Sequence, residues 1–278
     1  MVENSTTKNP LGSTARWTAA ARVLESARND RLFDDPWAGL LAGPEGSTWA
    51  ANRPPDSVAP MVLRIRFFDD FLQRVTREDA IRQVVLMAAG LDTRAYRLAW
   101  PVGTSIFELD QPPVLQEKEE ALRSAGAHSL CARRTIEVDL TGTWKEALIK
   151  AGFEPSQPSV WLLEGFLFYI PAESIPHLLD EVNSLALSGS WLGFDIINST
   201  TLTSPYTRQW IEMQATSGAP WIGSMDDPIG FLAKRGWKTA LTQAGAPNAN
   251  HGRWHLPIIP VTMPDMPHNW FVTAQKGK

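Results

Sequence analysis

The stretch Gln83-Val84-Val85-Leu86-Met87-Ala88-Ala89-Gly90-Leu91-Asp92-Thr93-Arg94 decides the fold of this chain. It begins as an uninterrupted apolar run bounded by polar residues, a pattern typical of a strand that is buried on both faces of a parallel sheet. The run ends in small residues, and at Gly90 the backbone can turn tightly and let a ligand come close. We therefore expect a buried strand over residues 83–88 that leads directly into a ligand-binding turn.

A second strand-like run, Ser105–Asp110, ends in a carboxylate twenty positions after Gly90. In a doubly wound sheet, a glycine turn after one strand and an acid at the tip of the next strand together hold a ribose. The pair Gly90 and Asp110 therefore predicts a nucleoside site.

Strand-like and helical patterns alternate from residue 83 onward. Apolar runs predict strands over residues 83–88, 105–110, 134–139, 159–164 and 191–197. Helical patterns predict helices over residues 93–98, 113–124, 144–151 and 173–187. Because strands that alternate with helices build parallel sheets, we predict an α/β fold with a doubly wound, mostly parallel sheet covered by helices on both faces.

The segments outside this alternating region are helical or irregular. Before it we expect a loose arm over residues 1–13, helices over 14–27 and 57–76, a short helix that Asp35 caps and Gly43-Pro44 ends, and a polar loop over 46–55. After it we expect helices over 206–216 and 227–235, strands over 237–241 and 269–274, and an irregular segment over 245–267.

The simplest division is a single domain over residues 1–278. Within it we expect a helical cap or arm (1–80), a cofactor-binding core (81–197), and an acceptor-side insertion with the last strands (198–278).

Composition narrows the class of protein. Of the 278 residues 44% are hydrophobic, which is enough for a sizeable core. The net charge is −4, and no run of lysines and arginines suggests binding to nucleic acid or to a membrane surface. No stretch approaches the ~18 apolar residues of a membrane-spanning helix, and the polar N-terminus lacks the apolar part of a signal peptide. The single cysteine, Cys131, excludes an internal disulfide and a cysteine-based zinc site, and we expect no metal. These features predict a soluble, cytoplasmic protein and leave its oligomeric state open.

The helix expected over residues 57–76 carries one apolar stripe with two arginines beside it. Arg64 lies about 100° before Ile65 and flanks the stripe, whereas Arg66 lies about 100° after it and further from the centre of the stripe. Arg64 is therefore better placed to point into a cleft beside the core. Two solvated arginines are the alternative.

Acidic residues follow three consecutive strands of the predicted sheet. Glu108 and Asp110 close the second strand, Asp139 closes the third and Glu164 closes the fourth. Ligands of open α/β sheets bind at the carboxyl ends of the strands, so we expect these carboxylates to hold hydroxyl or amino groups or to offset a positive charge. Unrelated solvated carboxylates are the alternative.

A dinucleotide site is the natural competitor, and it would need several glycines so that a pyrophosphate can approach backbone N–H groups. The turn Ala88-Ala89-Gly90-Leu91-Asp92-Thr93 offers one glycine, and Asp92 would repel a pyrophosphate. The pattern therefore favours a nucleoside without phosphate.

Several ordered motifs resemble the leucine carboxyl methyltransferase family, and most closely its bacterial S-adenosylmethionine-dependent branch, which includes polyketide carboxyl and O-methyltransferases. The motifs are Ala89-Gly90-Leu91-Asp92-Thr93-Arg94, Phe107-Glu108-Leu109-Asp110, Val138-Asp139-Leu140, Leu163-Glu164-Gly165-Phe166-Leu167-Phe168-Tyr169, Arg64-Ile65-Arg66-Phe67-Phe68-Asp69-Asp70 and Phe33-Asp34-Asp35-Pro36. The resemblance runs from about Ser13 to Ile197. It implies a class I methyltransferase fold, Rossmann-like and seven-stranded, with an N-terminal helical cap and an irregular C-terminal lid. One departure is Ala88-Ala89-Gly90, where the eukaryotic enzymes carry an extra glycine.

The resemblance also implies the cofactor S-adenosyl-L-methionine, with S-adenosyl-L-homocysteine as its product. By the same resemblance Arg64, or alternatively Arg66, would pair with the methionine carboxylate of the donor. Gly90 would lie under the methionine and the ribose, and Asp110 would accept hydrogen bonds from the ribose hydroxyls.

At the other strand tips, the resemblance implies that Asp139 and Leu140 would hold the adenine. Glu164 would lie near the amino group or the sulfonium of the donor. Ala89, Asp92 and Gly165 complete the cofactor-binding set that we expect.

The expected reaction is in-line methyl transfer to a carboxylate or a phenolic hydroxyl of a small organic molecule, such as a natural product of secondary metabolism. A carboxylate, with a pKa near 4, is already ionised, whereas a phenol, with a pKa near 10, would benefit from a general base. The histidines, His251 and His255 among them, are given no catalytic role. Four tryptophans either form an aromatic acceptor pocket or pack the lid against the sheet: Trp210, Trp221, Trp254 and Trp270.

Two other classes of function stay open. One is a nicotinamide-dependent reductase of Rossmann type, which the missing phosphate-binding glycines disfavour. The other is a catalytically silent protein that binds S-adenosylmethionine and acts through partners.

Overall fold

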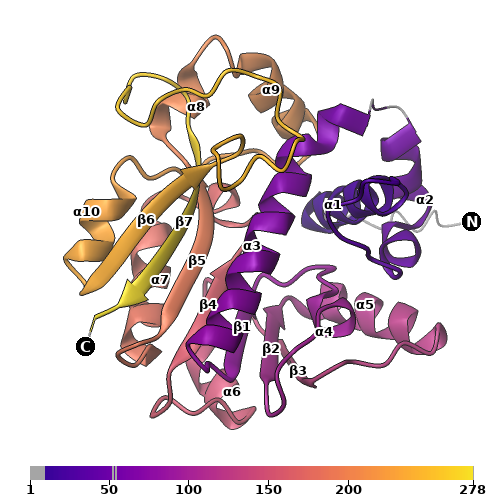
Figure 1. The fold of residues 1–278 in the computed structure, drawn as a ribbon, viewed down its shortest axis with the longest axis vertical. Coiled ribbons are helices and arrows are strands. Elements are labelled where there is room, and N and C mark those ends of the chain that lie inside the picture. The colour runs from indigo at the N-terminus through magenta and orange to yellow at the C-terminus, as the bar shows by residue number, and fades with distance from the viewer. Residues whose placement is uncertain (1–9, 52, 54, 278) are drawn as a thin grey trace, which may run out of the picture.

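A computed structural model describes residues 10–51, 53 and 55–277 of the chain (Figure 1). At its centre a seven-stranded sheet has the strand order β3-β2-β1-β4-β5-β7-β6. The strands are β1 (Gln83–Met87), β2 (Ser105–Asp110), β3 (Ala132–Glu137), β4 (Ser159–Leu163), β5 (Trp191–Ile197), β6 (Trp237–Gln243) and β7 (Asn269–Lys276). The first five strands are parallel, and β7 pairs antiparallel with both β5 and β6. The expected α/β, mostly parallel sheet is confirmed.

Helices precede the sheet, connect its strands and cover it. They are α1 (Pro10–Ser26), α2 (Ala38–Ala51), η1 (Pro55–Val58), α3 (Ala59–Glu78), α4 (Arg94–Arg97), α5 (Pro112–Ser124), α6 (Lys145–Lys150), η2 (Leu167–Tyr169), α7 (Ser174–Leu185), α8 (Ser199–Thr203), α9 (Arg208–Thr216) and α10 (Pro228–Ala233). In the part of the chain that the structure describes, none of them has both the length and the apolar character needed to cross a bilayer.

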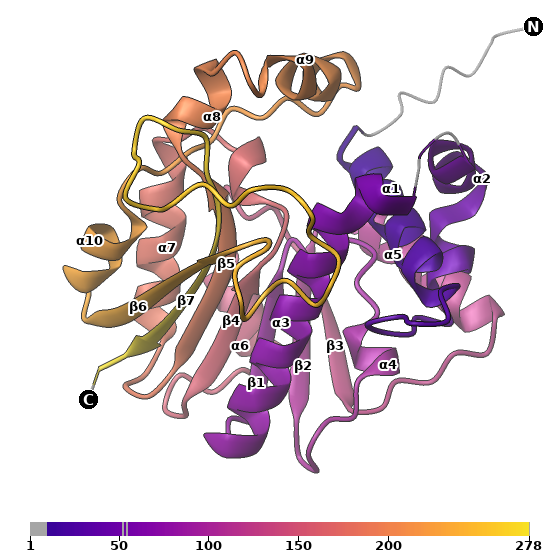
Figure 2. The ribbon, with the colours of Figure 1, turned by 45° about the horizontal axis from the view of Figure 1, so that its top comes forward.

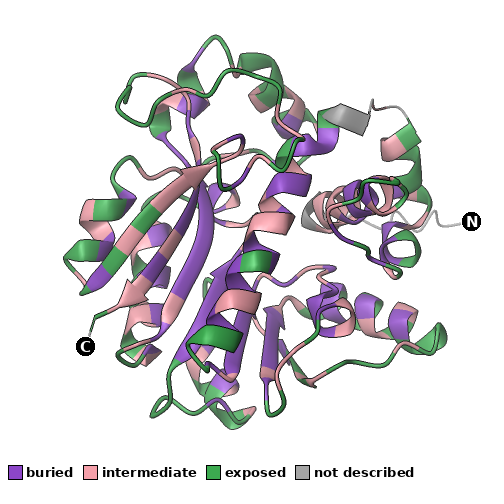
Figure 3. Ribbon diagram, viewed as in Figure 1, coloured by how far each residue is buried: buried purple, intermediate pink, exposed green. Residues whose placement is uncertain are grey.

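Apolar side chains fill both faces of the sheet. β1 and β4 are buried along their whole length, which explains why their sequences are apolar without alternation. On one face α3 packs Phe68 and Leu72 against strand residues such as Val84, and on the other face α6 and α7 pack Leu148 and Leu179. Figure 3 shows the result: the central strands are buried, while the outer strand β6 is partly exposed.

Two groups of helices lie over the carboxyl ends of the parallel strands (Figure 2). α1 and α2, which pack together through residues such as Ala19 and Leu41, lie on one side, and α8 and α9 lie on the other. The sheet therefore supplies a base, and helices that precede β1 and follow β5 supply the cover.

The irregular segment 244–268 crosses over α3 toward the end of α1 (Figure 2). Its Arg253 donates to the carboxylate of Glu25 at 3.0 Å and to that of Asp30 at 2.9 Å. Because Glu25 and Arg253 are both largely buried, these contacts fasten the C-terminal segment to the N-terminal cap.

Several expected boundaries near the N-terminus are wrong. Residues 10–13 belong to α1 rather than to a loose arm, and residues 1–9 lie outside the described part of the chain. Residues 46–51 are helical rather than a loop, because Gly43 interrupts α2 with φ 58° and Pro44 then begins a second helical segment, where a missing N–H is tolerated.

Two other expectations differ from the structure. Asp35, expected to cap a helix that begins at Pro36, does accept the N–H of Trp37 at 3.0 Å through its Oδ1, but α2 begins at Ala38. Its Oδ2 binds Arg22 at 2.7 Å and the hydroxyl of Thr93 at 2.5 Å. β3 lies two residues earlier than expected, because this edge strand is mostly exposed and its apolar pattern is weak. As a consequence Asp139 follows the strand at a short distance instead of ending it.

Candidate active site

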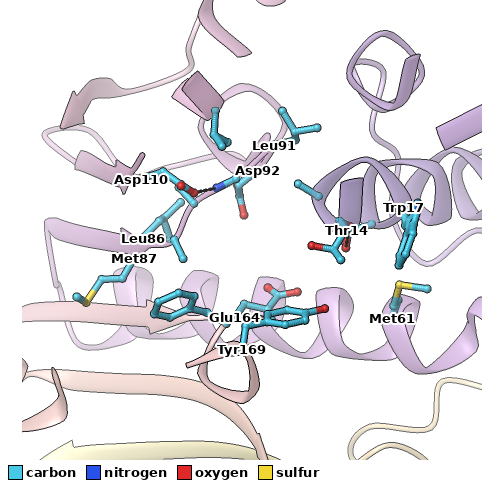
Figure 4. A pocket seen from close by; sticks show the side chains of 18 of the residues that line it. Thr14, Trp17, Met61, Leu86, Met87, Leu91, Asp92, Asp110, Glu164 and Tyr169 are labelled. Carbon is cyan, nitrogen blue, oxygen red and sulfur yellow. Dashed lines mark hydrogen bonds between the residues drawn. The ribbon is translucent and has the colours of Figure 1, made fainter. Parts of the chain in front are cut away.

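A cavity of about 320 Å³ opens where β1, β2 and β4 end under the cover of α1, α2 and α9. Nine of the ten residues expected to bind the cofactor line it: Arg64, Ala89, Gly90, Asp92, Asp110, Asp139, Leu140, Glu164 and Gly165. In Figure 4, Asp110 reaches this space from the sheet and Trp17 and Met61 reach it from α1 and α3, with Glu164 and Tyr169 between them. The fold thus brings together residues that are more than a hundred positions apart in the sequence.

Arg66 is the expected residue that does not reach the cavity. Its guanidinium binds Asp70 one turn further along α3, with Nε and Oδ2 2.8 Å apart, and donates to the carbonyl oxygen of Leu32. Its side chain is 34% exposed, against 12% for Arg64. Arg64 therefore occupies the inward position on α3, as its place beside the apolar stripe predicts.

A hydrogen bond joins the turn after β1 to the tip of β2. The N–H of Gly90 donates to Oδ2 of Asp110 at 2.6 Å, and the N–H of Gln111 donates to Oδ1 at 2.7 Å. Gly90 has φ 50°, a left-handed conformation that glycine adopts without penalty. Burial raises the pKa of Asp110, and the two N–H groups partly offset this effect. The carboxylate is fixed at the cavity wall, and its remaining lone pairs can accept hydrogen bonds from a ligand.

Ala88 shares the left-handed backbone conformation of this turn, with φ 51°. For a residue with a side chain this conformation costs ~1–2 kcal/mol. The turn therefore keeps its shape with alanine at this position, but under strain.

Arg64 enters the cavity from α3 and is held by two carboxylates. Its Nε donates to Glu164 and its Nη1 donates to Asp195, both at 3.0 Å. Asp195 is completely buried in β5, and its other oxygen accepts the N–H of Gly165 at 2.6 Å. Burial would lower the pKa of Arg64, but Asp195 and Glu164 raise it above its ordinary value, so the guanidinium is charged.

The remaining terminal nitrogen of Arg64, Nη2, makes no hydrogen bond with the residues that the structure describes. A Cβ on Gly165 would lie 3.0 Å from this nitrogen. The glycine thus leaves the guanidinium accessible, with donors available for an anionic ligand.

A second buried arginine, Arg94, joins three acids below the cavity. It binds Asp69 and Glu164 at 2.7 Å and Asp92 at 2.5 Å. Burial would raise the pKa of Asp92, but Arg94, Lys118 and Arg97 lower it to about 2. Asp92 is therefore negatively charged and paired with Arg94. In a dinucleotide site the backbone of this turn would bind phosphate, which the charge of Asp92 would repel.

Asp139 lies at the exposed end of the cavity. Its carboxylate accepts hydrogen bonds from the hydroxyl of Thr141 at 2.7 Å and from its N–H at 2.9 Å, and both lower its pKa. The neighbouring Leu140 is buried. A carboxylate and an apolar surface therefore lie side by side here.

Sequence reasoning missed two groups of residues at this site. One feature of the sequence could have pointed to Asp195: it is the single acidic residue within the apolar run Trp191–Ile197. The residues of the cover had no local signal, because helices far apart in the chain bring them together: Thr14, Trp17, Trp49, Arg53, Met61, Met213 and Gln214. Of the four tryptophans considered for an acceptor pocket, Trp210 and Trp221 line the cavity, and Trp254 and Trp270 do not.

A family model for leucine carboxyl methyltransferase matches residues 15–183, which include most of α1, the inward-facing arginine of α3 and the strand tips around the cavity. The chain belongs to the leucine carboxyl methyltransferase family.

Bacterial relatives agree with this membership of the leucine carboxyl methyltransferase family. Proteins of Frankia alni and Streptomyces coelicolor, both named as candidate S-adenosyl-L-methionine-dependent methyltransferases, are 40% and 39% identical to this chain over 236 and 246 residues. Each alignment covers 82% of this chain and 83% of the relative. The expected family, with S-adenosyl-L-methionine as its cofactor, is confirmed.

Solved structures share the fold of this leucine carboxyl methyltransferase family member. A DUF574 family protein from Streptomyces avermitilis superposes with a TM-score of 0.61 over 93% of this chain and 96% of its own, at 13% identity. A protein from Thermobifida fusca, described as a candidate methyltransferase, gives a TM-score of 0.56 over 93% and 94%, at 15% identity. The expected class I methyltransferase fold is confirmed.

Proposed function

We propose that this protein is an S-adenosyl-L-methionine-dependent O-methyltransferase that acts on the carboxylate of a small organic molecule. The observation that carries the proposal is the cavity in which Arg64, Asp110 and Glu164 converge from one helix and two strand tips. Within this proposal the segment 81–197, together with Arg64 of α3, supplies the cofactor side, and the rest of the segments 1–80 and 198–278 supplies the acceptor side.

The cavity residues fit the donor group by group. Arg64 offers a charged guanidinium with free donors to the methionine carboxylate, which planar guanidinium groups bind well. Asp110 offers lone pairs to the ribose hydroxyls, and Asp139 beside Leu140 offers a carboxylate and an apolar surface to the adenine. Glu164 offers a carboxylate to the amino group or the sulfonium. Asp92 disfavours the pyrophosphate of a nicotinamide cofactor.

The bound donor supplies a methyl group on a positively charged sulfur, which the acceptor oxygen displaces in line. The task of the chain is to align the two reactants and to exclude water. Arg64 and Asp110 hold the methionine carboxylate and the ribose of the donor, while Trp17, Met61 and Tyr169 surround the remaining space.

The side chains of the cavity favour a carboxylate over a phenol as the acceptor. All five histidines lie in the described part of the chain, and none of them lines the cavity. Burial raises the pKa of Tyr169, so its hydroxyl stays protonated and does not act as a base. A carboxylate needs no base, because its pKa of about 4 leaves it ionised at neutral pH.

Calorimetric titration of the wild-type protein and Asp110→Asn with S-adenosyl-L-methionine, S-adenosyl-L-homocysteine and NADH tests the proposal. We expect both sulfur nucleosides to bind, NADH not to bind, and the variant to bind at least tenfold more weakly, which corresponds to about 1.4 kcal/mol. Binding of NADH without the sulfur nucleosides would establish the reductase alternative instead.

Turnover separates an enzyme from a silent binding protein. Small carboxylic acids and phenols, incubated with protein and donor, should yield S-adenosyl-L-homocysteine and a methyl ester that mass spectrometry detects. Donor binding without release of S-adenosyl-L-homocysteine for any acceptor would favour the silent alternative, and methyl ethers in place of esters would show a phenol O-methyltransferase.

A further inference from the structure

Arg53 differs from the other arginines of the cavity. Four arginines that line it have carboxylate partners within the protein: Arg22 with Asp35, Arg64 with Glu164 and Asp195, Arg94 with Glu164, and Arg97 with Asp69. Arg53 has none among the residues that the structure describes. Its guanidinium lies 4.4 Å from the ring centroid of Trp49 and donates to the sulfur of Met213 at 3.6 Å. A ring and a thioether do not neutralise its charge, so Arg53 can bind an anion.

Gln214 follows Met213 on α9 and brings a second polar group to the cavity wall. Gln214 is only 4% exposed, and its side-chain Oε1 accepts no hydrogen bond within the described part of the chain. A buried acceptor without a donor is unfavourable, and native proteins rarely leave one. Since Gln214 lines the cavity, a ligand can supply the missing donor.

Flat aromatic surfaces surround these two groups. Trp17 and Trp49 stack with their rings 6.0 Å apart and 9° from parallel. Trp221 packs against Trp210, with ring centroids 5.8 Å apart, and all four rings line the cavity. Such surfaces favour a planar, apolar ligand, because stacked and edge-on ring contacts add to the gain from burial.

We propose that Arg53, Gln214 and these tryptophans form the acceptor subsite, and that the acceptor is an aromatic carboxylic acid with a hydrogen-bond donor on its ring. The proposal rests on the proposed function. Arg53 binds one oxygen of the carboxylate, and Gln214 accepts a hydrogen bond from the ring substituent. The carboxylate oxygen forms the new bond to the methyl group, the sulfur keeps the electron pair of the broken bond, and no proton moves. The ester has lost the negative charge that Arg53 binds, which favours its release.

Calorimetry on protein saturated with S-adenosyl-L-homocysteine tests the subsite. The probes are 4-hydroxycinnamate, cinnamate without the hydroxyl, 4-hydroxycinnamamide without the charge, and hexanoate without the ring. We expect 4-hydroxycinnamate to bind at least tenfold more tightly than the amide or hexanoate, and severalfold more tightly than cinnamate.

Variants assign these preferences to residues. Arg53→Gln should weaken binding of 4-hydroxycinnamate at least tenfold and leave binding of the amide unchanged. Gln214→Leu should remove the preference for 4-hydroxycinnamate over cinnamate, and Gln214→Glu should restore it. Arg66→Gln, which changes an arginine outside the cavity, is the matched control and should alter none of these values.

The outcomes separate the two proposals. Failure of the wild-type protein to bind S-adenosyl-L-homocysteine would overturn the proposed function. If S-adenosyl-L-homocysteine binds normally, the proposed function stands. The subsite would then be overturned by any one of three results: no aromatic acid binds, the acid and the amide bind equally, or Arg53→Gln binds the acid as the wild type does.

Discussion

Arg64 on α3 and Asp195 on β5 are separated by 131 positions in the sequence and meet at 3.0 Å at the inner wall of the cavity. The other oxygen of Asp195 accepts the N–H of Gly165 in the turn after β4. One buried carboxylate therefore sets both the direction of the guanidinium and the shape of the turn beside it. Under the proposed function Asp195 is a positioning residue, because it would act on the donor only through Arg64.

Replacing Asp195 with asparagine should affect stability and donor binding together. Asp195→Asn keeps an oxygen for the N–H of Gly165 but leaves the charge of Arg64 with one carboxylate fewer. Breaking a buried ion pair costs ~3 kcal/mol or more, so we expect a loss of that size in the free energy of unfolding and at least tenfold weaker binding of S-adenosyl-L-methionine. Urea unfolding and calorimetry measure the two effects.

Asp70→Asn is the matched control, because it breaks the exposed pair with Arg66 on the same helix. Such pairs contribute ~0–1 kcal/mol. Equal effects of the two substitutions on donor affinity would contradict the positioning role of Asp195.

Donor binding should depend on pH through Asp110. Burial raises the pKa of this carboxyl group, so it begins to take up a proton at a higher pH than an ordinary aspartate. A protonated Asp110 accepts hydrogen bonds poorly, and affinity for S-adenosyl-L-methionine should therefore fall as the pH is lowered from 7.5 into the acidic range. Calorimetry across this range should show a weaker dependence in Asp110→Asn; an unchanged profile would assign the titration to another group.

Asp92 should stabilise the fold in a pH-dependent way. Its pKa is about 2 in the folded protein against 3.8 ordinarily, a difference worth roughly 2 kcal/mol. Because the folded-state pKa is lowered, this stability is present above pH 3.8 and is lost as the pH falls toward 2. Asp92→Asn should therefore lower the free energy of unfolding by ~2 kcal/mol at pH 6, and the gap to the wild type should narrow below pH 4. A gap that stays constant with pH would show that charge is not its cause.

The strained turn after β1 predicts a stabilising substitution. Ala88→Gly removes the strain of a left-handed alanine, which costs ~1–2 kcal/mol. Glycine itself destabilises the fold by ~0.5–1 kcal/mol, because it has more conformational freedom to lose from the unfolded chain. The free energy of unfolding should rise by about 0.5–1 kcal/mol. Ala89→Gly, one residue on and without positive φ, should lower it instead. A loss of stability in Ala88→Gly would mean that the methyl group of Ala88 contributes more through packing than the strain costs.

The contact between Arg253 and Glu25 predicts coupling between the two ends of the chain. A double-mutant cycle with Arg253→Ala and Glu25→Ala should give a coupling energy on the order of 1–2 kcal/mol. Limited proteolysis should cut within residues 244–268 faster in Arg253→Ala, since the segment loses its contact with α1. A coupling energy near zero would indicate that packing over α3 alone holds the segment.

The central fold could be predicted because its signals are local. The apolar runs of β1 and β4 mark buried parallel strands, and the residues that end β1, β2 and β4 mark the site. Arg64 and Arg66 could be ranked from helix geometry alone. Errors arose where a segment has few apolar residues, as in β3, or where one glycine permits a kink, as at Gly43.

The cover of the site could not be predicted for a different physical reason. Arg53 and Gln214 lie on segments that meet only in three dimensions, and nothing near either residue in the sequence shows that the other lies beside the same cavity. The role of Asp195 could not be predicted because its partner, Arg64, is distant in the sequence. An acid in the middle of an apolar strand is nevertheless a signal that a buried positive charge lies nearby.

The order of the last three strands has a consequence for how the chain assembles. β7 lies between β5 and β6, so β6 is synthesised first yet joins the sheet only through a strand that comes later. Until β7 is in place, the edge of β5 presents unpaired backbone groups beside apolar residues such as Leu192 and Phe194, and such an edge can pair with a second copy of the chain. A nascent chain that stops before residue 269, or a product truncated there, should therefore be prone to aggregation even though its five parallel strands are complete.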